Sequence, residues 1–177
     1  LVGRPIAVVR ALLTLDAPDD VAEVTITEAG GADARRAAYD ALVEDIGRAQ
    51  HHVHLEYYIF MPDESGTQVR DALVACVARG VRVRLLLDAI GSGACSRAFL
   101  ASLTDAGGEI AWFHPTRFWR FWSRPWLNLR THRKIVVIDN RIAYTGGINV
   151  TDDENDRLRS DAYRDLHLRI EGDAVRA

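Results

Sequence analysis

One stretch of this chain, residues 131–149 (THRKIVVIDNRIAYTGGIN), constrains the fold more than any other. It holds an apolar run at 135–138, a second run at 142–145, and Asp139-Asn140 between them. Aspartate and asparagine favour tight turns because their short side chains bond to the local backbone. The pattern therefore predicts a β-hairpin whose apolar strand enters a core.

Two polar residues, His132 and Lys134, lead into the first strand of this hairpin. Side chains alternate along a strand, so residues two apart point to the same side. That places an imidazole next to an ammonium on one rigid surface. A neutral imidazole can attack phosphorus, and a lysine can hold anionic oxygens. Asp139 falls at the turn instead, where we expect a structural role.

The spacing H-x-K-x-x-x-x-D followed by G-G-x-N resembles the HKD signature of the phospholipase D superfamily. The alternative is a buried hairpin around a hydrogen-bonded core histidine. That alternative does not explain why Gly146, Gly147 and Asn149 follow the hairpin. The resemblance implies that the histidine of one motif attacks a phosphodiester and forms a phosphohistidine. The histidine of a second motif then protonates the leaving alcohol. The resemblance implies no metal and no cofactor.

This chain carries one HKD motif and shows no internal repeat. Members of the superfamily typically combine two motifs, which come from two halves of one chain or from two subunits. We therefore expect a second HKD half as a partner, supplied by the same natural chain or by a homodimer.

The resemblance also implies which residues form the site. The candidate catalytic residues are His132, Lys134, Asp139 and Asp165, and those expected to bind the substrate phosphate are Lys134, Gly146, Gly147 and Asn149. Superfamily members hold the second nitrogen of the histidine with an acid placed just before a strand. Asp165 matches that position; the alternative is a solvated carboxylate at a strand start. His132 would be the nucleophile or its partner acid, and the glycines would let backbone approach the phosphate.

Length and composition indicate one globular domain. The chain has 177 residues, 48% of them hydrophobic, and its formal net charge of −3 argues mildly against a dedicated nucleic-acid binder. The cysteines, Cys76 and Cys95, form no metal-binding pattern, and Cys76 is expected in a core. The sequence contains no apolar run of about 18 residues that would predict a membrane span, and no visible signal peptide.

Apolar periodicity alternates between strands and helices along most of the chain. Besides the hairpin, strands are expected at 21–27, 52–60, 81–88, 109–113 and 164–170, and helices at 33–50, 66–79 and 96–106. This order predicts a layered α/β fold with a mixed, largely parallel sheet. The resemblance implies that it is an α/β/α phospholipase D-like domain. We place that domain at 33–177 and leave 1–32 as an unassigned N-terminal extension.

Further phrases resemble the N-terminal half of bacterial cardiolipin synthases in particular. They are EYYIF at 56–60, RGVRVRLLLD at 79–88, Gly91-Ser92, and RDLHLRIEG at 164–172. The resemblance implies a phosphatidyltransferase half-domain that makes cardiolipin from phosphatidylglycerol or a related phospholipid. Its expected partners are the phospholipid substrate and a membrane surface, with no nucleic acid. The expected location is the cytoplasmic side of the inner membrane, either peripheral or anchored by segments outside this chain.

All four tryptophans lie within residues 112–126, and arginines alternate with aromatic residues at 117–126. Such side chains favour the membrane–water interface, where rings lie at headgroup level and arginines meet lipid phosphate. The candidate membrane-interface residues are Trp119, Phe121, Trp122 and Trp126. Base stacking on nucleic acid and packing within the protein are the alternatives.

Three further features have weaker functional interpretations. Glu56 could approach the active site or be a paired structural carboxylate, and Asp88 could face a ligand or cap its own loop. The histidines at 51, 52 and 54 diverge along a strand, so no metal site is expected there. The acidic stretch at 151–156 is expected to be a solvated loop near the site, since it lacks the glycine and spacing of an EF-hand.

Two other functions compete with phosphatidyl transfer. A single-motif homodimer could act as a phosphodiesterase or nuclease, although the acidic net charge weighs against it. The chain could also be a non-catalytic lipid-binding fragment. A two-fold dimer with facing His132 residues would argue against that last function.

Overall fold

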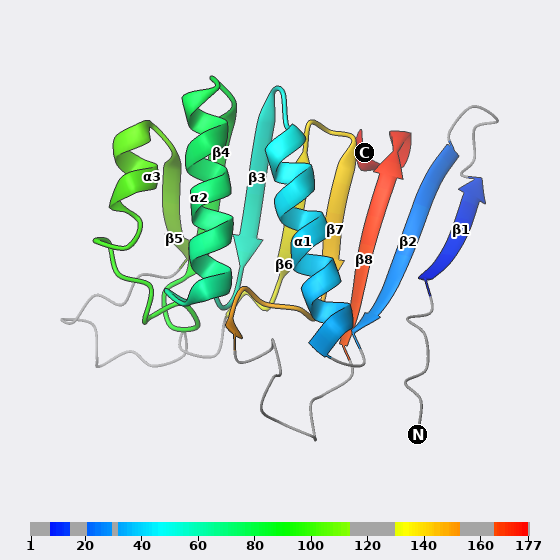
Figure 1. Ribbon diagram of the computed structural model, residues 1–177, viewed down its shortest axis with the longest axis horizontal. Coiled ribbons are helices and arrows are strands. Elements are labelled where there is room, and N and C mark those ends of the chain that lie inside the picture. Colours follow the sequence, from blue (N-terminus) through cyan, green and yellow to red (C-terminus); the bar gives the residue numbers. More distant parts are fainter. Residues whose placement is uncertain (1–7, 15–20, 30–31, 114–129, 153–164, 177) are drawn as a thin grey trace.

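Eight strands form one mixed sheet with α-helices packed along it (Figure 1). The computed structural model describes residues 8–14, 21–29, 32–113, 130–152 and 165–176. The strands are β1 (Val8–Thr14), β2 (Val21–Ala29), β3 (His52–Tyr57), β4 (Arg82–Asp88), β5 (Glu109–Phe113), β6 (Lys134–Ile138), β7 (Ile142–Gly146) and β8 (Asp165–Gly172). The helices are α1 (Ala32–Arg48), α2 (Glu64–Ala78), α3 (Ala101–Ala106) and the short 3-10 helix η4 (Asp173–Arg176).

The order of the strands across the sheet is β1-β2-β8-β7-β6-β3-β4-β5. Strands β3, β4 and β5 run parallel, because a helix crosses over between each of them. The other five neighbouring pairs are antiparallel. The prediction of a mixed α/β sheet is confirmed, but the prediction that it is largely parallel is wrong. Strands joined directly by a turn, as in the β6–β7 hairpin, reverse direction.

The first 32 residues, expected to form an unassigned extension, supply two strands to the same sheet. The strand predicted at 21–27 is confirmed as β2, and β1 pairs with it. β2 in turn pairs with β8, from Ala22↔Gly172 to Ala29↔Asp165. The described part of this segment therefore extends the sheet rather than forming a separate unit. The pairing joins segments from opposite ends of the sequence, which periodicity does not detect.

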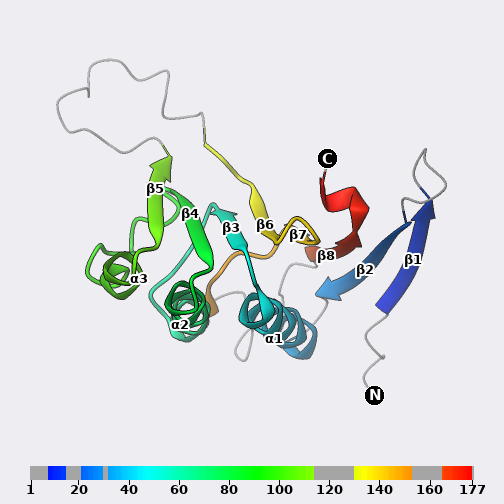
Figure 2. The same ribbon diagram turned by 90° about the horizontal axis from the view of Figure 1, so that it is seen from above.

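The helices α1, α2 and α3 all lie on one face of the sheet (Figure 2). Burial alternates along β3 and β4, so every second side chain enters the core between sheet and helices. This core includes Leu42, Ile46, Val69, Leu73 and Cys76 from the helices and Val53, Leu55, Leu85, Leu87 and Val136 from the strands. The second helical layer of the predicted α/β/α arrangement is not seen among the described residues. The prediction that Cys76 lies in a core is confirmed.

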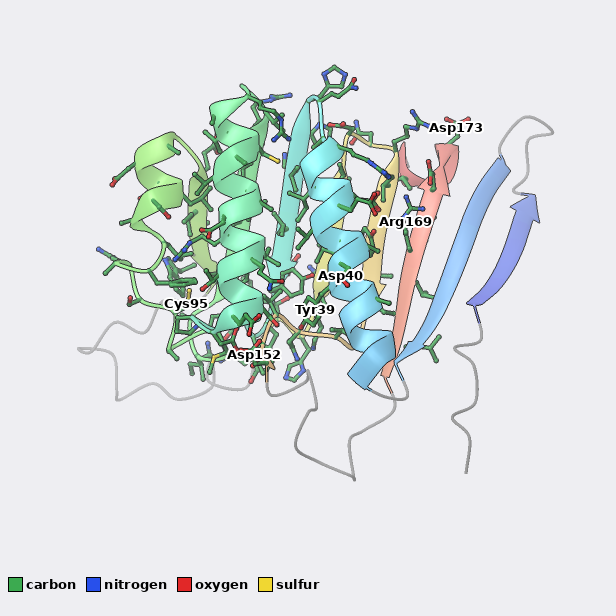
Figure 3. All side chains as sticks on the ribbon, viewed as in Figure 1. Tyr39, Asp40, Cys95, Asp152, Arg169 and Asp173 are labelled. Atoms are coloured by element: carbon green, nitrogen blue, oxygen red, sulfur yellow. The ribbon has the colours of Figure 1, made fainter. Side chains whose placement is uncertain are left out.

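A buried polar network ties α1 to the strands β7 and β8, and Figure 3 labels its member Arg169 on β8. The carboxylate of Asp45 accepts a hydrogen bond from Arg169 Nε at 2.7 Å and another from the Tyr144 hydroxyl. Arg169 also donates to Glu171 at 2.8 Å. Burial and the hydrogen bond to Asp45 raise the pKa of Tyr144, and the hydrogen bond to Asp45 raises that of Arg169. Both side chains therefore keep their protons, and the network stays intact over the physiological pH range.

We expect Asp45→Ala to lower the free energy of unfolding by about 3–5 kcal/mol, because it leaves a mostly buried guanidinium and a buried hydroxyl without their acceptor. Chemical denaturation followed by circular dichroism measures this difference. Asp40, exposed on the same helix, is the matched control, and Asp40→Ala should change the free energy by less than about 0.5 kcal/mol. Equal effects of the two substitutions would contradict the role of the network.

Candidate active site

His132 and Lys134 lie where the end of β3 meets the start of β6. The two strands are antiparallel, and the register places Tyr57 opposite Lys134. Lys134 belongs to the buried face of β6, which it shares with Val136 and Ile138, and its side chain is 9% exposed. Its Nζ donates to the carbonyl of His132 at 3.0 Å. The imidazole of His132 is exposed at the edge of the site, next to a lysine that is largely shielded from water.

An aromatic ring that the sequence did not single out contacts both motif side chains. The Tyr58 ring stacks on the His132 imidazole with 4.0 Å between centroids and 21° between planes. Lys134 Nζ lies 5.5 Å from the centroid of the same ring. Tyr58 belongs to the segment EYYIF, which contributed to the family resemblance but was given no functional role. It follows β3 directly, and this position brings its ring into contact with His132 and Lys134.

The loop after β4 holds Tyr58 in place. The buried Ser92 hydroxyl donates to the Tyr58 carbonyl and accepts from the Phe60 amide, both at 3.0 Å. A Cβ on Gly91 would lie 2.3 Å from the Tyr58 carbonyl oxygen and 2.8 Å from its ring, so this position requires glycine. Asp88 Oδ1 accepts from the amides of Ile90 and Gly91 at 2.9 and 3.0 Å. The structure thus supports the loop-capping interpretation of Asp88.

The segment before His132 is anchored by two acidic residues. Thr131 Oγ1 donates to Glu56 Oε1 at 2.6 Å, and Arg133 Nη1 lies 3.8 Å from the same oxygen. Arg130 Nη1 lies 3.6 Å from Oδ1 of the fully buried Asp88. Glu56 is therefore the paired carboxylate that the sequence offered as one of two possibilities. The contacts of Thr131 and Arg130 thus hold the backbone that enters β6, whereas the long, exposed Arg133 pair adds little.

Asp139 lies at the opposite end of β6 from Lys134. Its carboxylate accepts the backbone N–H groups of Gln50, His51 and His52, each at 2.8 Å. Burial alone would raise the pKa of Asp139, but the three donors outweigh it and hold the pKa below its ordinary value. Asp139 and Asn140 form the turn with positive φ angles of 54° and 52°. The structure does not bring Asp139 to His132, so we remove it from the candidate catalytic set and assign it the structural role expected from its turn.

We expect Asp139→Asn to lower the free energy of unfolding at pH 7 by about 1–3 kcal/mol, because the amide is a poorer acceptor for three backbone donors. The pKa of Asp139 is depressed in the folded chain, so its stabilisation is fully present above its ordinary pKa of 3.8 and is lost as the pH falls through the lower folded value. The difference between wild type and variant should therefore shrink below about pH 4.

Chemical denaturation at a series of pH values from 3 to 7 measures this dependence. Asp105, exposed on α3, provides the control substitution Asp105→Asn, which should have little effect at any pH. A stability difference for Asp139→Asn that stays constant down to pH 3 would contradict the assignment.

The glycine pair at the end of β7, Gly146 and Gly147, packs against β8. Gly146 has a φ of 147°, and a Cβ there would lie 2.1 Å from the Leu166 carbonyl oxygen. The Gly147 amide donates to that carbonyl at 3.0 Å. The observed contacts of both residues are thus with β8, and their role in approaching a phosphate stays a prediction.

Asn149 holds the backbone that leaves β3. Its Oδ1 accepts from the Ile59 amide at 3.2 Å, and its carbonyl accepts the hydroxyl of Tyr39 from α1. A bridge between Phe60 and Val150 continues the same contact. The strand predicted at 52–60 therefore ends at Tyr57, and residues 58–60 turn toward the segment that follows the glycines. Asn149 is 6% exposed. Its side chain contacts Ile59, the residue that follows Tyr58.

Asp152 caps helix α2 rather than lying in a solvated loop (Figure 3). Its carboxylate accepts the amides of Glu64 and Ser65 at 2.9 Å and the Ser65 hydroxyl at 2.6 Å. Asp63, the N-cap residue of α2, accepts the Asp152 amide in return at 2.7 Å. A carboxylate at a helix N-terminus satisfies orphan amides and complements the helix dipole. The expectation of a solvated loop is wrong at this residue, and 153–156 lie outside the described residues.

Other predicted site residues are placed only in part. Asp165 begins β8 opposite Ala29, and its role in orienting the histidine stays a prediction. The candidate membrane-interface residues Trp119, Phe121, Trp122 and Trp126 lie outside the described residues.

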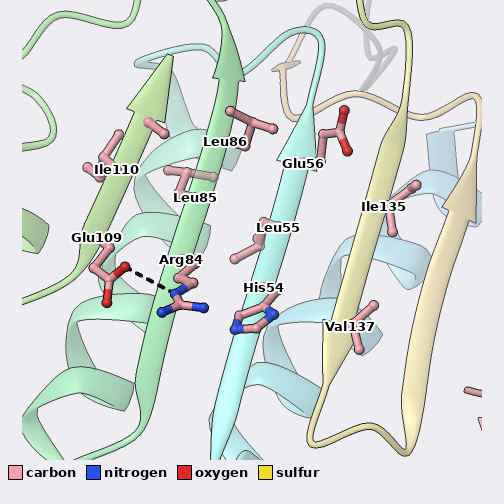
Figure 4. Close-up of a pocket in the computed structure, with 11 residues that line it drawn as sticks. His54, Leu55, Glu56, Arg84, Leu85, Leu86, Glu109, Ile110, Ile135 and Val137 are labelled. Carbon is pink, nitrogen blue, oxygen red and sulfur yellow. Dashed lines mark hydrogen bonds and ion pairs between the residues drawn. The ribbon is translucent and has the colours of Figure 1, made fainter. Parts of the chain in front are cut away.

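The face of the sheet opposite the helices carries an open hollow of about 470 Å³ (Figure 4). It is lined by His54, Glu56, Arg84, Leu86, Glu109, Ile135 and Val137, among others. Burial and the positive charges of His52, Arg84 and Arg82 lower the pKa of His54.

Within the described part of the chain, no group of three or more histidine, cysteine or acidic residues is arranged to hold a metal ion.

A family model described as the phospholipase D-like domain of cardiolipin synthase matches residues 42–163. The chain belongs to this family. It is 42% identical over 138 residues to cardiolipin synthase 1 of Bacillus anthracis, which covers 77% of this chain and 27% of that protein. It is 41% identical over 143 residues to the major cardiolipin synthase of Bacillus subtilis (strain 168), which covers 80% and 29%. The chain thus spans less than a third of the length of these relatives.

Two solved structures share the fold over most of their length. NucT from Helicobacter pylori has a TM-score of 0.60 at 12% identity, with 86% of this chain and 87% of that one covered. Nuc from Salmonella typhimurium, a phospholipase D family member, has a TM-score of 0.56 at 21% identity, with 85% and 84% covered. These likenesses confirm the predicted phospholipase D-like fold. None of the helices in the described residues is long and apolar enough to cross a membrane.

Proposed function

We propose that this chain is the N-terminal catalytic half of a phosphatidyltransferase that makes cardiolipin from phosphatidylglycerol. The observation that carries the proposal is the exposed imidazole of His132 beside the shielded ammonium of Lys134, in a chain of the cardiolipin synthase family. An exposed imidazole can reach a lipid phosphodiester, and a nearby cation in a site of low water content stabilises the anionic oxygens of the transition state.

The reaction proceeds in two displacements on one phosphorus. An imidazole nitrogen attacks the phosphodiester of the donor, so that a P–N bond forms and the P–O bond to the leaving glycerol breaks. The second imidazole of the site gives its proton to the departing oxygen. The hydroxyl of a second phosphatidylglycerol then attacks the phosphohistidine, returns its proton to that imidazole and breaks the P–N bond. His132 supplies one of the two imidazoles, and the second HKD half supplies the other.

The phosphodiester bond is exchanged rather than hydrolysed, so its free energy is conserved and no nucleotide is needed. Lys134 binds the non-bridging oxygens of the phosphate. Its ammonium has three donors, and one of them bonds to the His132 carbonyl in the structure. This bond keeps the ammonium close to the backbone of His132, and the remaining donors bind the phosphate oxygens, as electrostatic catalysis requires. Asp165 orients His132 through its second nitrogen, and the glycine pair and Asn149 approach the same phosphate.

The site meets its substrate at a membrane surface. The aromatic and arginine-rich segment at 117–126 immediately precedes the motif in sequence, and such a composition favours the headgroup region. The enzyme acts on the cytoplasmic side of the inner membrane, and the second HKD half comes from the same natural chain or from a homodimer.

We expect His132→Ala to abolish cardiolipin formation in the natural full-length protein. Purified protein is incubated with phosphatidylglycerol vesicles in EDTA, and the lipid products are identified by mass spectrometry. Lys134→Met should reduce the rate by about 10²–10³-fold, the usual cost of removing one oxyanion donor. Arg133→Met, at the exposed neighbouring position, is the matched control and should retain most of the activity.

Cardiolipin formation by a folded His132→Ala protein would refute the proposal. Cleavage of single-stranded DNA in EDTA, without any lipid product, would favour the homodimeric phosphodiesterase or nuclease instead.

A further inference from the structure

Within the described part of the chain, the imidazole of His132 stacks on the ring of Tyr58. Their centroids are 4.0 Å apart and their planes are 21° apart, which is a stacked arrangement. The two residues are 74 positions apart in sequence, and the antiparallel pairing of β3 with β6 brings them together. His132 is exposed whereas Tyr58 is half-buried, so the tyrosine ring packs against one face of an otherwise exposed imidazole.

Polar contacts hold the backbone from Tyr58 to Phe60. The fully buried Ser92 hydroxyl bridges the Tyr58 carbonyl and the Phe60 amide. Asn149 accepts the amide of Ile59, the residue between them. Gly91 leaves the space that the Tyr58 ring occupies, since a Cβ there would lie 2.8 Å from two of its carbons. The ring is thus a fixed surface, and the loop after β4 is shaped around it.

Stacking has two consequences for an imidazole that reacts. It restricts rotation of the ring, while both nitrogens remain free because they lie on the edge of the ring and not on its face. The negative face of an aromatic ring also attracts a cation, so it favours the imidazolium over the neutral ring. A histidine that bonds to phosphorus or carries a proton to a leaving group passes through a positively charged state. Lys134 Nζ, 5.5 Å from the same centroid, shows that this ring already contacts one cation of the motif.

We propose that Tyr58 is a positioning residue for His132: its ring holds the plane of the imidazole and stabilises the charged form that arises during phosphoryl transfer. This inference rests on the proposed function, in which His132 is one of the two reacting imidazoles. It predicts that the aromatic ring of Tyr58 is needed and that its hydroxyl is not.

The test compares Tyr58→Leu and Tyr58→Phe in the natural full-length protein, with His132→Ala as the inactive reference. Tyr58→Leu should lower kcat for cardiolipin formation by roughly 2- to 10-fold and leave KM nearly unchanged, as expected for the loss of one aromatic pair. Tyr58→Phe should keep kcat close to the wild-type value. Ile90→Ala, which removes an exposed side chain from the same loop, should leave activity unchanged.

A second measurement reports the stacking without turnover. Proton resonances of the His132 ring, assigned by comparison with His132→Ala, should be shifted upfield by the Tyr58 ring current. Tyr58→Leu should abolish this shift, and Tyr58→Phe should preserve it. If Tyr58→Leu does not fold, Tyr58→Met fills the same space with a flexible side chain and serves in its place.

The outcomes separate this inference from the proposed function. Wild-type kcat in a folded Tyr58→Leu or Tyr58→Met protein, or a His132 resonance that does not respond to either variant, would overturn the positioning role alone. Activity that survives His132→Ala would overturn the proposed function, whatever the resonances show. Loss of kcat with Tyr58→Phe equal to that with Tyr58→Leu would also overturn the inference, since the hydroxyl and not the ring would then be responsible.

Discussion

The antiparallel pairing of β3 with β6 is the constraint on which the whole site depends. At one end of the pair, the carboxylate of Asp139 accepts three consecutive backbone amides at the start of β3. The register set there runs along both strands to Tyr57 opposite Lys134 at the other end. A slip of one residue would turn Lys134 to the opposite face of the sheet and separate His132 from Tyr58. The contacts of Asp139 at one end of the strand pair thus help to set the register that places Lys134 opposite Tyr57 at the other end.

Polar side chains hold together the loops that follow β3, β4 and β7. Ser92 binds the backbone on either side of Ile59, Asn149 binds Ile59 itself, and Asp152 caps α2. The partners in these contacts lie 32, 34, 90 and 88 residues apart, so each contact joins loops that are distant in sequence. An unmade buried hydrogen bond costs about 1–3 kcal/mol, which makes the loops mutually dependent.

Much of the fold follows from local patterns. The strand Glu109–Phe113 and the turn at Asp139-Asn140 were predictable because alternation, turn residues and glycine stops act over a few positions. The direction of the strands was not predictable in the same way. β6 and β7 pair antiparallel because a tight turn joins them, and β7 and β8 are also antiparallel, whereas the helix-connected β3, β4 and β5 are parallel. The pairing of β2 with β8 joins the two ends of the sequence, and no periodicity reports such a contact.

The sequence by itself was enough to propose the chemistry and to predict the hairpin that carries it. The spacing of His132 and Lys134 before an apolar run predicted a phosphate-directed pair, because side-chain direction along an extended chain depends only on residue number. Tertiary structure alone decided that Asp139 accepts the amides at the start of β3, that Asp152 caps a helix, and that the Tyr58 ring stacks on the imidazole. The physical reason is that these contacts depend on which strands become neighbours. That choice is made by the packing of the whole core and the register of the sheet, and it leaves no mark in any short segment.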